Sequence, residues 1–292
     1  MSERSAAPDY FIFGAERSGS TLLCALVNES ASHFILNDSF AFQAADNLVR
    51  SAKIAFDAVL SPREVPLYFA NLYRQYAQRE YGKYMWLEEY ARRTTGLFGP
   101  LVEESYQETL TLAEIVRRVV EALAAPNANG RWIGEKTPDH VRRLDCIKAL
   151  APSVPGIVIM RNPAHNIAAI DTRRKWPVKR LIDHYRTFYP EDVHCMPIVR
   201  YEDLAAGRLA GLKKAFASIA PDDAPGGLGD FRANDRIRAG KFDMYVKGYY
   251  VGTSVEPERA TVYETYFPDR TRQMIEAECA DLYALWEGAA CE

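Results

Sequence analysis

Residues 10–27 read YFIFGAERSGSTLLCALV, and this stretch decides the fold. Its first four residues are aromatic or β-branched, which predicts a short buried strand. Its last six residues are apolar and predict a helix, with Ser20 or Thr21 near the helix start, where hydroxyl side chains are favoured. A turn with Gly14 and Gly19 joins the two. A strand, a glycine-bearing turn and a helix in this order predict an α/β protein with an anion site at the turn.

The turn at residues 14–21, called the glycine loop below, nearly matches the nucleotide-binding pattern G-x-x-x-x-G-K-[ST]. Both glycines and Thr21 are in place, but Ser20 stands where the pattern has lysine. The spacing also arises by chance, but the strand before it and the helix after it favour the phosphate interpretation. Without the lysine that reaches the β- and γ-phosphates, ATP or GTP hydrolysis is disfavoured, and Arg17 supplies the cation instead.

Strands alternate with helices further along the chain. Short apolar runs predict strands at residues 34–36, 131–134, 156–160 and 198–201. Helical periodicity predicts helices at residues 111–125, 141–150 and 272–286. The alternation after residue 131 indicates βαβ units and a parallel sheet.

The segment from about residue 40 to 123 has a mostly helical pattern. Large apolar side chains recur there at helical spacing, and we interpret them as a core-facing stripe rather than an aromatic substrate cage: Tyr68, Phe69, Leu72, Tyr73 and Tyr76.

Composition excludes several classes of protein. Lys and Arg number 36 against 39 Asp and Glu, a formal net charge of −3, which argues against a general nucleic-acid binder. No apolar stretch reaches the roughly 18 residues of a membrane span, and the N-terminal residues lack a signal-peptide pattern. The five cysteines include no C-x-x-C pair and the five histidines lack ligand spacing, so we expect a reduced, cytoplasmic protein without a metal site.

A second basic position follows the predicted strand at 156–160. Arg161 comes directly after this strand, at the end where ligands bind in open α/β sheets. Arg173 lies one predicted helix further on. Because the guanidinium fork matches phosphate oxygens bidentately, the two arginines can converge on a second phosphate.

Five segments together resemble sulfotransferases that use 3′-phosphoadenosine 5′-phosphosulfate (PAPS). They occur in the order of that family and span most of the chain. Residues 11–23 resemble the 5′-phosphosulfate loop, and residues 135–138 (EKTP) resemble the lysine segment of the membrane-type and tyrosylprotein branches. Residues 157–163 are similar to the 3′-phosphate-binding strand and turn, 199–204 to the tyrosine-bearing segment, and 245–248 to the late Lys-Gly loop.

The resemblance implies an α/β protein with a P-loop-type three-layer fold, in which helices flank a central parallel sheet. It implies one sulfotransferase-like domain over residues 1–292, with a mostly helical acceptor-side insert at about 40–125. The implied reaction moves the sulfuryl group of PAPS, as co-substrate, in line to a hydroxyl group. The product is 3′-phosphoadenosine 5′-phosphate (PAP), and no metal takes part.

The family's site residues carry over position by position. The 5′-phosphosulfate would be held by the glycine loop: Arg17, Ser18, Gly19, Ser20 and Thr21. Lys136 would contact the bridging or sulfuryl oxygens, so Lys136 and Arg17 are catalytic candidates. Arg161 and Arg173 would bind the 3′-phosphate. The nucleotide would also lie near three later residues: Tyr201, Lys247 and Gly248.

The chain departs from the family pattern at two places. The family has a serine eight residues after the 3′-phosphate arginine, and this chain has Ala169 there. One phosphate hydrogen bond is therefore lost unless Thr172, Arg173 or a backbone amide replaces it. The late loop reads Gly252-Thr-Ser254 in place of Gly-Asp-Trp.

A general base is expected near the acceptor hydroxyl. The tyrosylprotein branch has a glutamate shortly after the loop helix, and ungapped counting from Arg17 puts Asp38 at that position. Asp38 is equally compatible with an N-cap of the following helix. His33 and His140 are the next candidates, because another branch uses a histidine, and we expect His140 at the surface.

Two glutamates adjoin the predicted anion site. We expect Glu16, within the glycine loop, to point away from the anion. We expect Glu135 to pair with the neighbouring Lys136.

The segment 40–107 matches none of the nucleotide motifs and is the predicted acceptor side. Its tyrosines and arginines are compatible with an aromatic or amphiphilic alcohol, a sugar or a peptide tyrosine, and we favour a small-molecule or natural-product hydroxyl as acceptor. Two other classes stay open: a phosphate-loop kinase, and a non-catalytic nucleotide-binding module. The oligomeric state cannot be read from the sequence.

Overall fold

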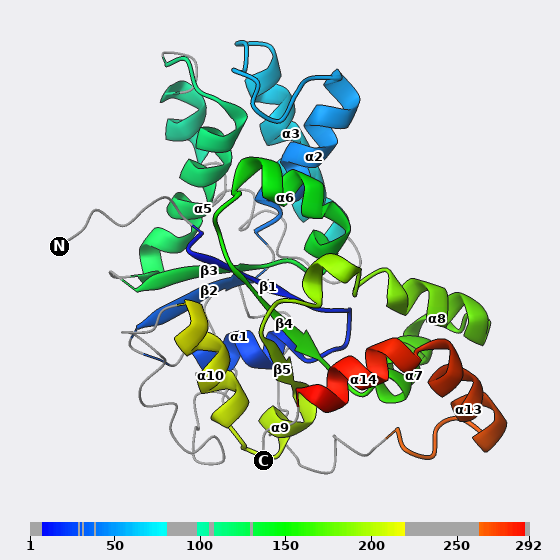
Figure 1. Ribbon diagram of the computed structural model, residues 1–292. Helices are drawn as coiled ribbons and strands as arrows, with labels where there is room; N and C mark the ends of the chain where they lie inside the picture. Colours follow the sequence, from blue (N-terminus) through cyan, green and yellow to red (C-terminus); the bar gives the residue numbers. More distant parts are fainter. Residues whose placement is uncertain are drawn as a thin grey trace.

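The computed structural model describes residues 8–28, 30, 32–37, 39–80, 98–104, 108–128, 131–219 and 263–289. One five-stranded sheet lies at the centre of this part of the chain (Figure 1). Its strands are parallel, in the order β2-β3-β1-β4-β5. They are β1 (Tyr10–Phe13), β2 (His33–Asn37), β3 (Trp132–Lys136), β4 (Gly156–Met160) and β5 (Ile198–Arg200). Every strand predicted from the sequence is confirmed.

Helices cover both faces of the sheet (Figure 1). Over one face lie α1 (Ser20–Asn28) and α10 (Ala210–Ile219). Over the other lie α2 (Ala41–Ala52), α5 (Leu112–Ala128) and α6 (Leu144–Leu150). Alternate side chains of β1 pack into the two apolar layers. Tyr10 and Ile12 pack on the α1 side of the sheet, and Phe11 and Phe13 pack on the α2 side. A three-layer α/β fold with a central parallel sheet is therefore confirmed.

The remaining elements lie on the flanks of these layers. They are α3 (Glu64–Glu80), α7 (Pro163–Arg174), α8 (Val178–Arg186), α9 (Tyr201–Ala205), α13 (Asp269–Glu278), α14 (Ala280–Gly288), and the 3₁₀ turns η1 (Pro138–Arg143) and η2 (Glu191–Val193). No helix in the described ranges combines the length and apolar content that crossing a bilayer requires.

Three predicted helices differ in detail from the observed ones. The helix predicted at 141–150 starts as η1, because Pro138 opens a 3₁₀ turn ahead of α6. The helix predicted at 272–286 is two helices, separated by the non-helical backbone of Cys279. α5 continues past the predicted stop at Pro126, since a proline in the last turn removes only one helical hydrogen bond.

The described part of the segment between β2 and β3 is mostly helical, and residues 98–104 are helical too. In α3, Tyr68, Phe69 and Leu72 are buried, and the Tyr68 hydroxyl donates to the Ala41 carbonyl. The core-facing interpretation of this stripe is confirmed for these residues. The side chain of Tyr76 lies outside the described part, as do residues 81–97 and 105–107. A single domain with an acceptor-side insert stays a prediction.

The parallel arrangement gathers the candidate residues at one edge of the sheet. Gly14 follows β1, Lys136 ends β3, Arg161 follows β4 and Tyr201 follows β5, so all four lie at the carboxyl ends of strands. The connection after β1 leads toward β2 on one side, and the connection after β4 leads toward β5 on the other. Ligands of open α/β sheets bind where neighbouring connections diverge in this way.

Candidate active site

The glycine loop has a backbone form that requires glycine at two positions. Gly19 has a φ of 93°, and a Cβ there would lie 2.2 Å from Cδ2 of Tyr201. A Cβ at Gly14 would lie 2.7 Å from the carbonyl oxygen of Ile159. Arg17 also takes a left-handed conformation, with a φ of 69°, which costs a non-glycine residue about 1–2 kcal/mol. Strain of this kind concentrates at functional sites.

The inner side of the loop offers hydrogen-bond donors to an anion. α1 begins at Ser20, so its first N–H groups have no carbonyl partner within the helix and lie at the positive end of its dipole. Ser18 is fully buried, and its Oγ has no hydrogen-bond partner among the described residues. Ser20 is buried, Thr21 is half-buried and Arg17 is exposed. An anion in this loop would satisfy groups that are costly to leave unpaired.

The outer side of the loop is fixed by two buried side chains. The Tyr189 hydroxyl accepts from the Ala15 N–H and donates to the Ile159 carbonyl, both at 3.3 Å. The side-chain amide of Asn166 donates to the Glu16 carbonyl at 2.9 Å. The loop is thus held from behind by groups that do not compete for its inner N–H donors.

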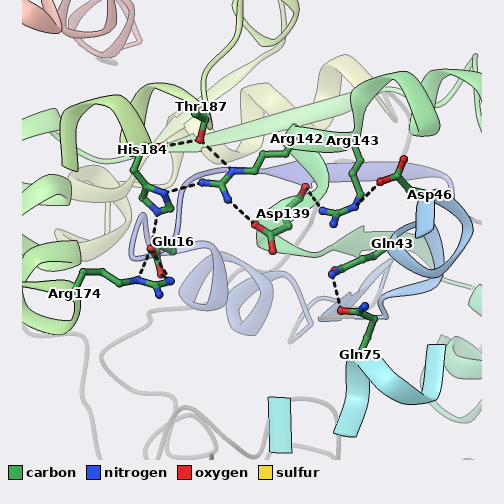
Figure 2. Close-up of polar contacts among 10 residues, drawn as sticks. All are labelled: Glu16, Gln43, Asp46, Gln75, Asp139, Arg142, Arg143, Arg174, His184 and Thr187. Carbon is green, nitrogen blue, oxygen red and sulfur yellow. Dashed lines mark hydrogen bonds and ion pairs between the residues drawn. The ribbon is translucent and has the colours of Figure 1, made fainter. Parts of the chain in front are cut away.

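The side chain of Glu16 binds α7 and α8 (Figure 2). It accepts hydrogen bonds from Arg174 at 3.1 Å and from Nε2 of His184 at 2.8 Å. Nδ1 of His184 lies 2.9 Å from Arg142, which can only donate, so the proton of the neutral imidazole is on Nε2. Burial alone would raise the pKa of Glu16, but the bonds from Arg174 and His184 outweigh it and lower the pKa. Glu16 therefore anchors the loop as a carboxylate.

Arg161 is buried against two aromatic rings. Its guanidinium carbon lies 4.4 Å from the ring centre of Tyr201 and 5.0 Å from that of Tyr263. Burial lowers its pKa most, Tyr201, Glu202 and Tyr263 act against this, and the charge of Arg17 lowers it further. The charge of Arg17 therefore acts on Arg161, and their convergence on one doubly anionic ligand stays a prediction.

The rest of α7 has a less direct relation to this site. Ala169 is fully buried, and the Thr172 hydroxyl donates to the Ala169 carbonyl at 2.9 Å, so both are engaged within the helix. Arg173 is exposed in the last turn of α7, about 15 Å along the helix axis from its start. Its role at a 3′-phosphate stays a prediction.

Lys136 is the last residue of β3 and is 2 % exposed. The register pairs Phe11 with Glu135, so Glu135 points with Phe11 to the α2 side and Lys136 points to the α1 side. α1 is the helix that starts at the glycine loop. The Lys136 side chain therefore lies on the same face of the sheet as the helix that starts at the glycine loop. The expectation that Glu135 pairs with Lys136 is wrong, because neighbouring strand residues face opposite ways.

Glu135 instead forms a buried polar cluster with three other residues. Its Oε1 accepts from the Ser39 hydroxyl at 2.6 Å and from the Thr137 hydroxyl at 2.9 Å. Its Oε2 lies 2.6 Å from Nδ1 of His140. All four side chains are at most 2 % exposed. The cluster, called the Glu135 cluster below, joins the turn after β2 to the turn after β3.

The two histidine candidates for the base are both enclosed. His140 was expected at the surface, but it is fully buried against Phe11 and Phe42, because the short η1 turn carries it inward to Glu135. His33 is also fully buried. It is the first residue of β2 and so lies at the amino end of the strand, whereas the glycine loop lies at the carboxyl ends of the strands. His140 is thus engaged with the Glu135 carboxylate, and His33 lies at the amino end of its strand.

Replacing Glu135 with leucine is expected to destabilise the fold by about 3–5 kcal/mol. The substitution removes the only carboxylate of the Glu135 cluster and leaves its buried partners without a hydrogen-bond acceptor. Urea unfolding followed by circular dichroism measures this change. Glu121→Leu is the matched control, because its ion pair with Arg117 is at the surface, and it should change stability by less than about 0.5 kcal/mol. Equal effects of the two substitutions would contradict a structural role for the cluster.

Several predicted site residues lie outside the described part of the chain: Asp38, Lys247 and Gly248. α2 begins at Ala41 with Phe40 in the N-cap position, and the Ala41 N–H donates to the Ser39 hydroxyl. Asp38 is therefore two residues before the N-cap. In the described ranges no group of three or more His, Cys, Asp or Glu side chains is arranged to hold a metal ion.

Comparison with known proteins extends these observations. A family model described as "Sulfotransferase family" matches residues 8–215. The sulfotransferase domain of the Synechococcus PCC 7002 olefin synthase has a similar fold, with a TM-score of 0.58, 16 % identity and 97 % of each chain covered. The sulfotransferase STF9 from Mycobacterium avium aligns with a TM-score of 0.47 and 11 % identity over 96 % of this chain and 78 % of its own. No curated protein sequence matches the chain.

Proposed function

The chain belongs to the sulfotransferase family, and we propose that it transfers the sulfuryl group of PAPS to a hydroxyl of a small-molecule acceptor. One observation carries the choice of donor. The ring of Tyr201 contacts Gly19 of the glycine loop on one side and the guanidinium of Arg161 on another. Two anion-binding elements separated by a single ring suit a nucleotide with anionic groups at both its 5′ and 3′ positions.

The residues at the carboxyl edge fit this nucleotide. The buried hydroxyl of Ser18 lacks a partner among the described residues, and Gly14 and Gly19 let the loop backbone pack directly against Ile159 and Tyr201. The glycine loop would hold the 5′-phosphosulfate, and Arg161 the 3′-phosphate. PAPS supplies an activated sulfuryl group when it is bound.

The protein's part in the transfer is electrostatic and steric. The acceptor oxygen forms a bond to sulfur, the sulfur–oxygen bond to the 5′-phosphate breaks, and the acceptor proton goes to a base, which we propose is Asp38. Lys136 and Arg17 neutralise negative charge on the sulfuryl and leaving oxygens. This charge grows as the sulfur–oxygen bond to the 5′-phosphate breaks, so the stabilisation grows with it. The low exposure of Lys136 increases this effect, because charge interactions are stronger away from water.

The donor is tested by comparing two nucleotides in a thermal unfolding assay. At 100 times its Kd, PAP should stabilise the protein by about 2.7 kcal/mol, or about 5 °C in Tm. ATP with Mg²⁺ at the same concentration should have little effect, because Ser20 replaces the lysine that binds the β- and γ-phosphates. Stabilisation by ATP alone would reject PAPS and favour the kinase. Binding of PAP without transfer from PAPS to any hydroxyl in an acceptor panel would favour the non-catalytic module.

The acceptor class is proposed from the segment between β2 and β3, which holds tyrosines and arginines outside the nucleotide motifs. Such side chains suit an aromatic or amphiphilic alcohol. The similar solved structure is a domain of an olefin synthase, and at 16 % identity that likeness concerns the fold. The acceptor panel should therefore include phenols, aliphatic alcohols and sugars.

A further inference from the structure

Tyr263 contributes the second ring of the Arg161 site from a distant part of the sequence. It lies beyond residue 215, where the family match ends. Its ring centre is 5.0 Å from the guanidinium carbon of Arg161, and Tyr201 contacts the same group at 4.4 Å. Arg161 is only 5 % exposed. The C-terminal segment is thus part of the wall of the proposed nucleotide site.

The ring of Tyr263 is supported by contacts to α7. It packs edge-on against Tyr266, with ring centres 5.8 Å apart. The Tyr266 hydroxyl donates to the Asp171 carboxylate at 2.9 Å and accepts from the Lys175 ammonium at 3.2 Å. Asp171 lies in α7, which starts two residues after Arg161, and Lys175 is the C-cap residue of that helix. Tyr263 therefore has a defined position relative to Arg161.

Two rings restrict how the guanidinium meets a ligand. A planar guanidinium stacks with its face on an aromatic ring and keeps its N–H donors in its plane. A ring that covers a face of the guanidinium leaves its edge for an anion, and two parallel N–H bonds to phosphate oxygens form along that edge. The stack also lowers the number of rotamers that binding would otherwise have to freeze.

We propose that Tyr263 is a positioning residue for recognition of the 3′-phosphate: it holds the Arg161 guanidinium against Tyr201 with its N–H edge toward the ligand. The C-terminal segment then sets the preference of the enzyme for 3′-phosphorylated nucleotides. This inference rests on the proposed function, in which Arg161 binds the 3′-phosphate of PAPS.

The test is the ratio of the Kd for adenosine 5′-phosphate to the Kd for PAP, measured by isothermal titration calorimetry. The two probes differ only in the 3′-phosphate, so the ratio isolates that group. Tyr263→Leu should lower the ratio about tenfold and leave the affinity for adenosine 5′-phosphate unchanged. Tyr263→Phe keeps the ring and should keep the wild-type ratio. Tyr263→Gln, which also lacks the ring, replaces Tyr263→Leu if that variant does not fold.

Arg161→Met distinguishes a failure of the Tyr263 positioning role from a failure of the proposed donor. If wild-type protein prefers PAP and Arg161→Met loses the preference while Tyr263→Leu keeps it, the positioning role is wrong and the proposed donor stands. If wild-type protein binds the two nucleotides equally, the proposed donor fails and this inference fails with it. A loss of affinity for both nucleotides in Tyr263→Leu and Tyr263→Gln would show a merely structural role and overturn the proposal.

Discussion

Replacing Lys136 with methionine is expected to lower kcat by about 10²–10³-fold, the usual cost of removing one preorganised donor from a transition state. The side chain is buried at the end of β3, on the α1 side of the sheet, where the glycine loop begins that helix. In the proposed reaction the charge on the leaving oxygen grows as the sulfuryl group departs. An ammonium group that faces this oxygen acts more strongly in the transition state than in the bound substrate.

The substitution should separate chemistry from folding and binding. Methionine is close to lysine in volume, so the space at the end of β3 stays filled, and Tm measures separately what the loss of the charge costs the fold. The Kd for PAP should rise much less than kcat falls, which single-turnover kinetics and calorimetry measure together. Lys148→Met is the matched control, because this lysine pairs with Asp192 at the surface. A wild-type kcat for Lys136→Met would show that Lys136 has no catalytic role.

Replacing Asp38 with asparagine is expected to lower kcat by about 10²–10⁴-fold, the contribution of a general base. Asparagine has the same size and the same preference as aspartate for helix N-termini, so the substitution removes the proton acceptor and leaves any capping contribution in place. The neighbouring Ser39 hydroxyl donates to Glu135, which ties the adjacent backbone to the end of β3.

The pH dependence of kcat/KM distinguishes the two interpretations of Asp38. If Asp38 is the base, the wild-type profile falls on the acid side as the carboxylate gains a proton, and Asp38→Asn loses this limb with its activity. If Asp38 stabilises the helix start, Asp38→Ala should cost about 1 kcal/mol of stability and Asp38→Asn should have wild-type kcat. The position of Phe40 as the observed N-cap of α2 favours the first outcome.

Features that depend on a few consecutive residues were predictable. The strand at 10–13, the glycine loop and the strand at 156–160 are local patterns, and their parallel packing follows from the alternation with helices. Placing Arg161 at the carboxyl edge required only that its strand be recognised. The C-terminal helix was predicted as one element because its apolar periodicity runs through Cys279, whose backbone breaks the helix.

Features that depend on distant contacts were not predictable from one sequence. Glu135 and Ser39 are 96 residues apart, and nothing local to either signals the hydrogen bond that joins them. His140 looks like a surface residue next to Pro138 and Asp139, and only tertiary packing shows that the η1 turn buries it. Tyr263 is one of 17 tyrosines, and only the fold selects it as the partner of Arg161. The strand pleat alone, however, predicts that Glu135 and Lys136 face opposite ways.

The ring of Tyr201 packs against both ends of the proposed nucleotide site, the glycine loop and Arg161, and so couples their positions. Gly19 has no side chain because that ring fills the space beside it, and the same ring is one support of Arg161. A substitution at Gly19 that displaces the ring would therefore change the position of Arg161 indirectly, through Tyr201. Variants at these two positions should therefore combine non-additively. Redirecting the enzyme to a donor without a 3′-phosphate would require the glycine loop and the Arg161 pocket to be redesigned as one unit.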